Sequence, residues 1–121
     1  MAKVLLVEDE PIVNRMYEKA LRFEGHEVDV VEDGEAALSH LESFIPDLVL
    51  LDIMMPKMDG FTVLSKIREN KKYMDLPVVI LTNLAGAEDT KKAMSLGATS
   101  YLVKSDLEPS KIVAEIEKNL K

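Results

Sequence analysis

At residues 48–52 the sequence reads Leu48-Val49-Leu50-Leu51-Asp52, four apolar residues followed at once by a carboxylate. No polar residue interrupts the apolar part, which is typical of a strand that is buried on both faces. Such strands belong to parallel sheets covered by helices, whereas a strand with one face in water alternates between apolar and polar residues. We therefore predict a buried parallel strand over 48–51, with Asp52 at its carboxyl end.

Four further strands are predicted from the same kind of pattern. Uninterrupted apolar runs lie at 4–7, 78–81 and 101–103, and a run that alternates lies at 28–31. The alternating run suits the edge of a sheet, because one of its faces meets water.

Helical spacing of apolar residues fills the intervals between the strands. The stripes are Val13, Met16, Tyr17, Ala20 and Leu21; Ala37, Leu38 and Leu41; Phe61, Leu64 and Ile67; residues 88–96; and Ile112, Val113, Ile116 and Leu120. Five strand–helix pairs predict an α/β fold, a flavodoxin-like doubly wound sheet of five parallel strands in the order 2-1-3-4-5, with five helices. We expect residues 1–121 to form one domain, with no output domain.

Composition limits the classes of function. The chain has a net charge of −7, with 14 acidic against 5 basic residues in 1–60 and 8 against 10 in 61–121. This charge disfavours direct nucleic-acid binding. No apolar run reaches the roughly 18 residues of a membrane span, and the start of the chain has no signal-peptide pattern. The absence of Cys excludes thiol chemistry. We expect a cytoplasmic protein.

The chemistry is expected where the carboxyl ends of neighbouring strands meet. In the predicted strand order, Glu8 and Asp9 follow the first strand beside Asp52. Carboxylates that converge in this way repel one another, and a hard divalent cation such as Mg²⁺ relieves the repulsion. Glu10 is adequately explained as a cap of the next helix, whereas Asp52 is followed by a loop and not by a helix. Thr82 and Lys104 end two further strands and can bind phosphoryl oxygens, with Asp52 as the nucleophile.

These positions resemble the receiver domains of two-component response regulators, in particular the single-domain chemotaxis regulators. The resemblance extends over most of the chain and rests on four segments, 4–10, 50–60, 80–82 and 97–104. It implies that a histidine kinase or a histidine phosphotransfer protein phosphorylates Asp52. It also implies Mg²⁺ held by Asp9, Asp52 and the backbone carbonyl of Met54, with Glu8 acting through water.

The same resemblance implies a phosphorylation-dependent switch. Thr82 would bind one phosphoryl oxygen and Lys104 another, and Tyr101 would turn inward when Thr82 moves. A plain core role for Tyr101 competes with this interpretation. The altered surface would comprise the fourth helix, the fifth strand and the fifth helix, and it would be read by an effector protein or an output domain in trans.

One position departs from the family pattern, because Ser105 follows Lys104 where proline is usual. A cis bond before a non-proline residue costs about 2.5–4 kcal/mol, so we predict a trans bond. His26 and His40 have no ligand partner nearby in the sequence, and we expect both to be solvated.

Three other functions share this fold. A phosphatase would need a second acid two residues after Asp52, where Met54 stands, and a flavin-binding module would need a Gly- or Ser-rich loop in place of Glu8-Asp9-Glu10. A degenerate receiver is disfavoured because all the acceptor positions are filled.

Overall fold

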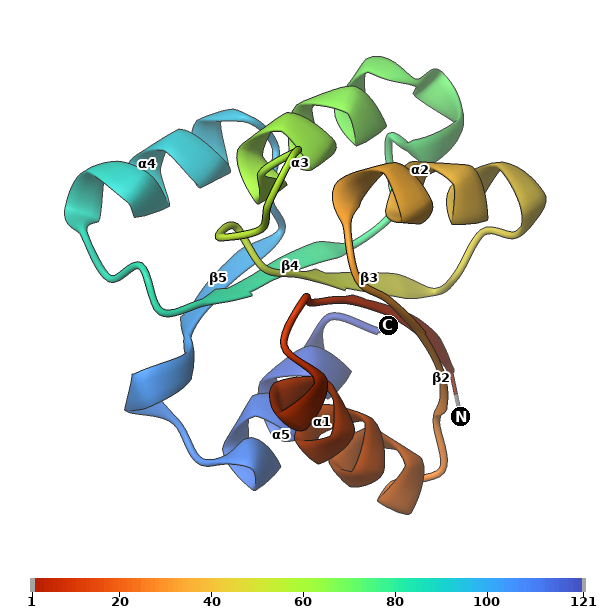
Figure 1. Ribbon diagram of the computed structural model, residues 1–121, viewed down its shortest axis with the longest axis vertical. Helices are drawn as coiled ribbons and strands as arrows, with labels where there is room; N and C mark the ends of the chain where they lie inside the picture. The colour runs from red at the N-terminus through yellow and green to blue at the C-terminus, as the bar shows by residue number, and fades with distance from the viewer. Residues whose placement is uncertain (1, 121) are drawn as a thin grey trace.

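Five parallel strands form one sheet in the order β2-β1-β3-β4-β5, which confirms the predicted topology (Figure 1). The strands are β1 (Lys3–Val7), β2 (Glu27–Val31), β3 (Leu48–Leu51), β4 (Val78–Thr82) and β5 (Ser100–Val103). Val7 pairs with Leu51, and Leu51 pairs with Ile80, so the carboxyl ends of the three central strands lie at one edge. The computed structural model describes residues 2–120.

Helices cover both faces of this sheet. They are α1 (Pro11–Phe23), α2 (Gly34–Ser43), α3 (Gly60–Glu69), α4 (Ala87–Ser95) and α5 (Pro109–Lys118), with short 3₁₀ turns η1 (Lys71–Tyr73) and η2 (Lys104–Asp106). Figure 1 shows α2, α3 and α4 on one face, and α1 with α5 on the other. This is the doubly wound arrangement that right-handed crossovers produce.

The two faces of the sheet bury separate apolar cores. In β1, Leu5 and Val7 face the α2–α4 side, while Val4 and Leu6 face the α1–α5 side. Because side chains alternate along a strand, an uninterrupted apolar run is needed to supply both cores. Burial of each such side chain contributes about 1.5–3 kcal/mol. The central strands are therefore held rigidly, and so are the residues at their ends.

Short polar caps position the helices that follow the sheet edge. The Asp33 carboxylate accepts a hydrogen bond from the backbone N–H of Ala36 at 2.8 Å at the start of α2. The Asp59 carboxylate accepts one from Thr62 at 3.0 Å at the start of α3. Each bond satisfies an amide that has no partner within its helix.

Helix α5 ends at Lys118, two residues before Leu120, the last apolar residue of its predicted stripe. Leu120 still packs on the α1–α5 core.

The prediction that both histidines are solvated is wrong. His26 is only 8% exposed, because the turn after α1 places it between the start of β1 and the end of α5. Its Nδ1 accepts a hydrogen bond from the Ala2 N–H at 3.2 Å, and its Nε2 lies 2.9 Å from a Glu117 oxygen. His40 is half-buried, with Nε2 3.1 Å from an Asp29 oxygen.

No helix within residues 2–120 is long and apolar enough to cross a bilayer.

Candidate functional site

Polar side chains gather at the carboxyl edge of the sheet, where the predicted site residues were expected to meet. Glu8 follows β1, Asp52 follows β3, Thr82 ends β4, and Lys104 follows β5. The backbone N–H of Asp52 bonds to the Val7 carbonyl at 3.1 Å, which extends the sheet register by one residue into the site. The structure therefore brings together residues that are up to 96 positions apart in the chain.

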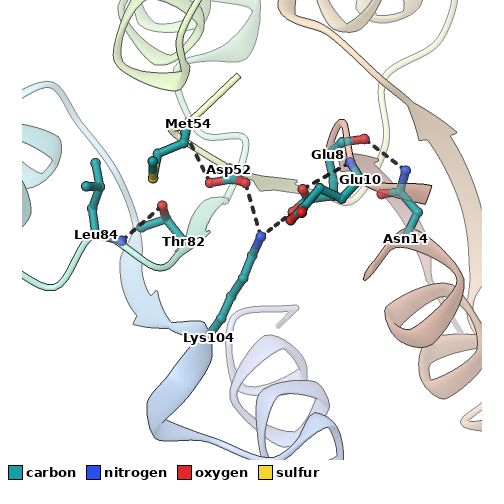
Figure 2. A network of polar contacts seen from close by, with 8 residues as sticks. All are labelled: Glu8, Glu10, Asn14, Asp52, Met54, Thr82, Leu84 and Lys104. Carbon is teal, nitrogen blue, oxygen red and sulfur yellow. Dashed lines mark hydrogen bonds and ion pairs between the residues drawn. The ribbon is translucent and has the colours of Figure 1, made fainter. Parts of the chain in front are cut away.

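The Asp52 carboxylate is oriented by two donors on opposite sides (Figure 2). Its Oδ1 accepts a hydrogen bond from the Met54 N–H at 3.2 Å, and its Oδ2 lies 3.1 Å from the Lys104 ammonium. Asp52 is only 6% exposed, which leaves little water to compete with these contacts. The carboxylate is thus held in one orientation at the end of a rigid strand.

Lys104 lies between two carboxylates. Besides Asp52, its ammonium donates to Glu8 Oε1 at 2.5 Å, and Figure 2 shows the side chain extending from the start of η2, directly after β5, to both acids. No cis peptide bond occurs in the described part of the chain, so the bond between Lys104 and Ser105 is trans, as predicted. A trans bond therefore allows Lys104 to reach Asp52.

Burial and charge shift the acid–base properties of this group. Burial raises the pKa of Glu8 from 4.5 to about 7; the hydrogen bond from Lys104 opposes this change, and the charge of Asp52 adds to it. Burial alone would lower the pKa of Lys104, but its hydrogen bond to Glu8 and the charge of Asp52 outweigh that effect and raise the pKa. The ammonium therefore stays protonated beside two acids whose joint ionisation is costly.

Three carboxylates form a set of oxygen donors suited to a hard cation. Glu8, Asp9 and Asp52 each offer one oxygen, and these oxygens lie within 4.8 Å of one another. A divalent ion with oxygen ligands fits such a set, because it offsets the repulsion among the acids. The chemistry of the donors therefore fits the cation predicted from the sequence.

A cavity of about 360 Å³ opens above Asp52. It is lined by Asp9, Glu10, Asp52, Met54, Asn83 and Lys104. Glu10 occupies the N-cap position of α1 but makes no capping bond with its side chain, so the capping role predicted for it is wrong. Glu10 lines the cavity instead.

Two residues at this edge, Asn83 and Asn14, were not predicted from the sequence. Asn83 lines the cavity, and its position directly after Thr82 was a signal that could have identified it. Asn14 is only 5% exposed and donates to the Glu8 backbone carbonyl at 2.9 Å. Its signal was a polar residue on the face of α1 that also buries Tyr17 and Leu21.

A short path of hydrogen bonds connects Thr82 to Tyr101. The Thr82 hydroxyl is fully buried and accepts a long hydrogen bond, 3.4 Å, from the Leu84 N–H (Figure 2). The carbonyl of the same Leu84 accepts a hydrogen bond from the Tyr101 hydroxyl at 2.7 Å. Both bonds therefore involve one residue of the loop before α4, and Tyr101 itself is half-buried.

Fold and site together define a doubly wound α/β domain with an acidic, lysine-paired centre at the carboxyl edge of its sheet. The pattern of the response regulator receiver domain matches residues 4–117, and the chain belongs to this family of signalling proteins in two-component systems.

Relatives and solved structures agree with this assignment. The probable transcriptional regulator ycf27 of Guillardia theta is 40% identical over 114 residues, which cover 94% of this chain and 43% of that protein. The gliding motility regulatory protein of Myxococcus xanthus is 37% identical over 87% of this chain and 14% of its own length. Among solved structures, the chemotaxis protein CheY4 of Vibrio cholerae has a TM-score of 0.92 at 31% identity and covers 99% of both chains. This chain thus spans less than half of the length of these curated relatives.

Proposed function

We propose that this receiver domain accepts a phosphoryl group on Asp52 from a phosphohistidine of a histidine kinase or a histidine phosphotransfer protein. The observation that carries the proposal is the Asp52 carboxylate itself, held between the Met54 N–H and the Lys104 ammonium at the mouth of an acidic cavity. One carboxylate oxygen attacks phosphorus while the bond between phosphorus and the imidazole nitrogen breaks, and the electron pair leaves with the imidazole.

The charges around Asp52 suit this transfer. Lys104 is positioned to pair with a phosphoryl oxygen, because its ammonium already lies 3.1 Å from the Asp52 oxygen. Asp9, Asp52 and the backbone carbonyl of Met54 would hold Mg²⁺, and Glu8 would act through water. When bound, the ion neutralises phosphoryl charge during transfer. The solved structure of the Mn²⁺-bound form of response regulator Rcp1, which has a TM-score of 0.87 at 32% identity, supports a divalent cation in this class of site.

The connection from Thr82 to Tyr101 supports a role in signalling. A phosphoryl oxygen near Asp52 would draw the Thr82 hydroxyl away from the Leu84 N–H, whose 3.4 Å bond is the weak one of the path. Leu84 would then move, and its carbonyl, which accepts the hydrogen bond of the Tyr101 hydroxyl, would move with it. The surface of α4, β5 and α5 would change as a result. We propose that an effector protein or an output domain in trans reads this surface, and that the chain binds neither nucleic acid directly nor a membrane. We also propose a cytoplasmic location for the protein.

The decisive experiment uses a small phosphodonor. Purified protein is incubated with acetyl phosphate or with beryllofluoride, with and without Mg²⁺, and the adduct is followed by mass spectrometry or NMR. We expect a Mg²⁺-dependent adduct that Asp52→Asn abolishes and that Asp106→Asn, an exposed acid in η2, leaves intact. Absence of an adduct in the wild-type protein would refute the phosphoacceptor role.

The same preparation tests the proposal that the chain is a signalling phosphoacceptor and not an enzyme for external substrates. The residue two positions after Asp52 is Met54, so no second acid stands ready to protonate a leaving group. We expect at most one phosphoryl group per chain and no sustained hydrolysis of phosphate esters. Many turnovers on such esters would favour a phosphatase.

A further inference from the structure

The cavity above Asp52 has two chemically different walls. Asp52 follows β3, which lies between β1 and β4 in the sheet. Asp9 and Glu10 line the cavity from the β1 side, and Asn83 lines it from the β4 side. A group attached to Asp52 would therefore have carboxylates on one side and a carboxamide on the other.

Asn83 differs from every other side chain that lines this cavity. Asp9, Glu10 and Asp52 are acidic, and the Met54 side chain is apolar. Lys104 is a donor, but its ammonium is already engaged by Glu8 and Asp52. The Asn83 side chain is exposed to the cavity and carries two N–H donors without a charge.

We propose that the Asn83 carboxamide is a binding group for the phosphoryl moiety on Asp52, with Nδ2 donating a hydrogen bond to a phosphoryl oxygen. This inference rests on the proposed function, in which Asp52 is the acceptor. A phosphoryl group presents oxygens in several directions, and the acidic wall offers them no hydrogen-bond donor. Lys104 and Thr82 are positioned for two of these oxygens, and Asn83, which directly follows Thr82, provides a further donor on the β4 side of the cavity.

The test is a titration with beryllofluoride at fixed Mg²⁺, followed by NMR, on the wild-type protein and on Asn83 variants. We expect Asn83→Ala to weaken binding by about three- to tenfold, the effect of one hydrogen bond. We expect Asn83→Gln, which retains the carboxamide, to recover at least half of that loss on a logarithmic scale. Asn83→Asp places a negative charge against the anion and should weaken binding by at least about tenfold. Asn119→Ala, at the end of α5, serves as a remote control with unchanged affinity.

Two further measurements separate binding from fold and metal effects. Because Asn83 is exposed, the thermal midpoint of Asn83→Ala should equal that of the wild type, and so should its affinity for Mg²⁺ alone. Equal beryllofluoride affinity in wild type and Asn83→Ala would overturn the inference and leave the phosphoacceptor role of Asp52 standing. An equal loss of affinity for Mg²⁺ alone would overturn it as well. Failure of the wild type to bind beryllofluoride would remove the proposed function and the inference together.

Discussion

Replacement of Gly60 by Ala should disturb both the stability of the domain and the position of Asp52. Gly60 is the first residue of α3, and its N–H donates to the Ile53 carbonyl at 2.9 Å. A Cβ added there would overlap the Asp52 carbonyl oxygen and lie 2.6 Å from the Ile53 Cα. Both neighbours are backbone atoms, so neither can move aside by rotation of a side chain. Relief requires the segment after β3 to shift by several tenths of an ångström.

The size of the effect follows from this lack of space. Overpacking of a closed site costs about 1–3 kcal/mol, and here the strain falls on the residue that carries the reactive carboxylate. Gly86 offers a matched control, because it precedes α4 and a Cβ there would meet only the flexible Asp89 side chain, at 3.2 Å. Gly86→Ala should therefore cost less than about 1 kcal/mol.

Urea unfolding followed by circular dichroism measures the stability of both variants, and formation of the Mg²⁺-dependent beryllofluoride adduct measures the site. We expect Gly60→Ala to lose more stability than Gly86→Ala and to bind beryllofluoride less tightly. Equal stability of the two variants, with equal adduct formation, would show that the close approach of α3 to Asp52 does not constrain the site.

Three other changes follow from the structure. Thr82→Ala should still be phosphorylated but should reduce the NMR shift of Tyr101 on activation, and an undiminished shift would contradict the path through the loop before α4. Because the pKa of Glu8 is raised to about 7, its contribution to stability is full below pH 4.5 and is lost as the pH rises through 7. In urea titrations without divalent cations, the free energy of unfolding of the wild type should fall by on the order of 3 kcal/mol relative to that of Glu8→Gln between pH 4.5 and about 7. Parallel pH profiles of the two proteins would contradict this. His26→Leu leaves Glu117 and the Ala2 N–H without their partner and should cost about 1–3 kcal/mol in urea unfolding, whereas wild-type stability would show that these bonds contribute nothing.

Much of the architecture could be predicted because it depends on local patterns. The uninterrupted run at 48–51 already indicated a strand covered on both faces, and the alternating run at 28–31 indicated the edge strand β2. The predicted strand order placed the ends of β1 and β3 side by side, as the structure confirms, so Asp52 and its acidic neighbours could be identified from the sequence. Periodicity reports which faces of an element are buried, and parallel connections restrict how the elements assemble.

The sequence by itself thus determined the sheet, the five helices and the edge where the acids meet. Only the tertiary structure decided that Lys104 bonds to Glu8 as well as Asp52, that His26 is buried against Glu117, and that Asn83 faces the cavity. Each of these features depends on how segments that are distant in the chain come together. Each depends also on the path of a loop and on the direction of one side chain. Local periodicity carries no information about either, because these are determined when the layers pack together.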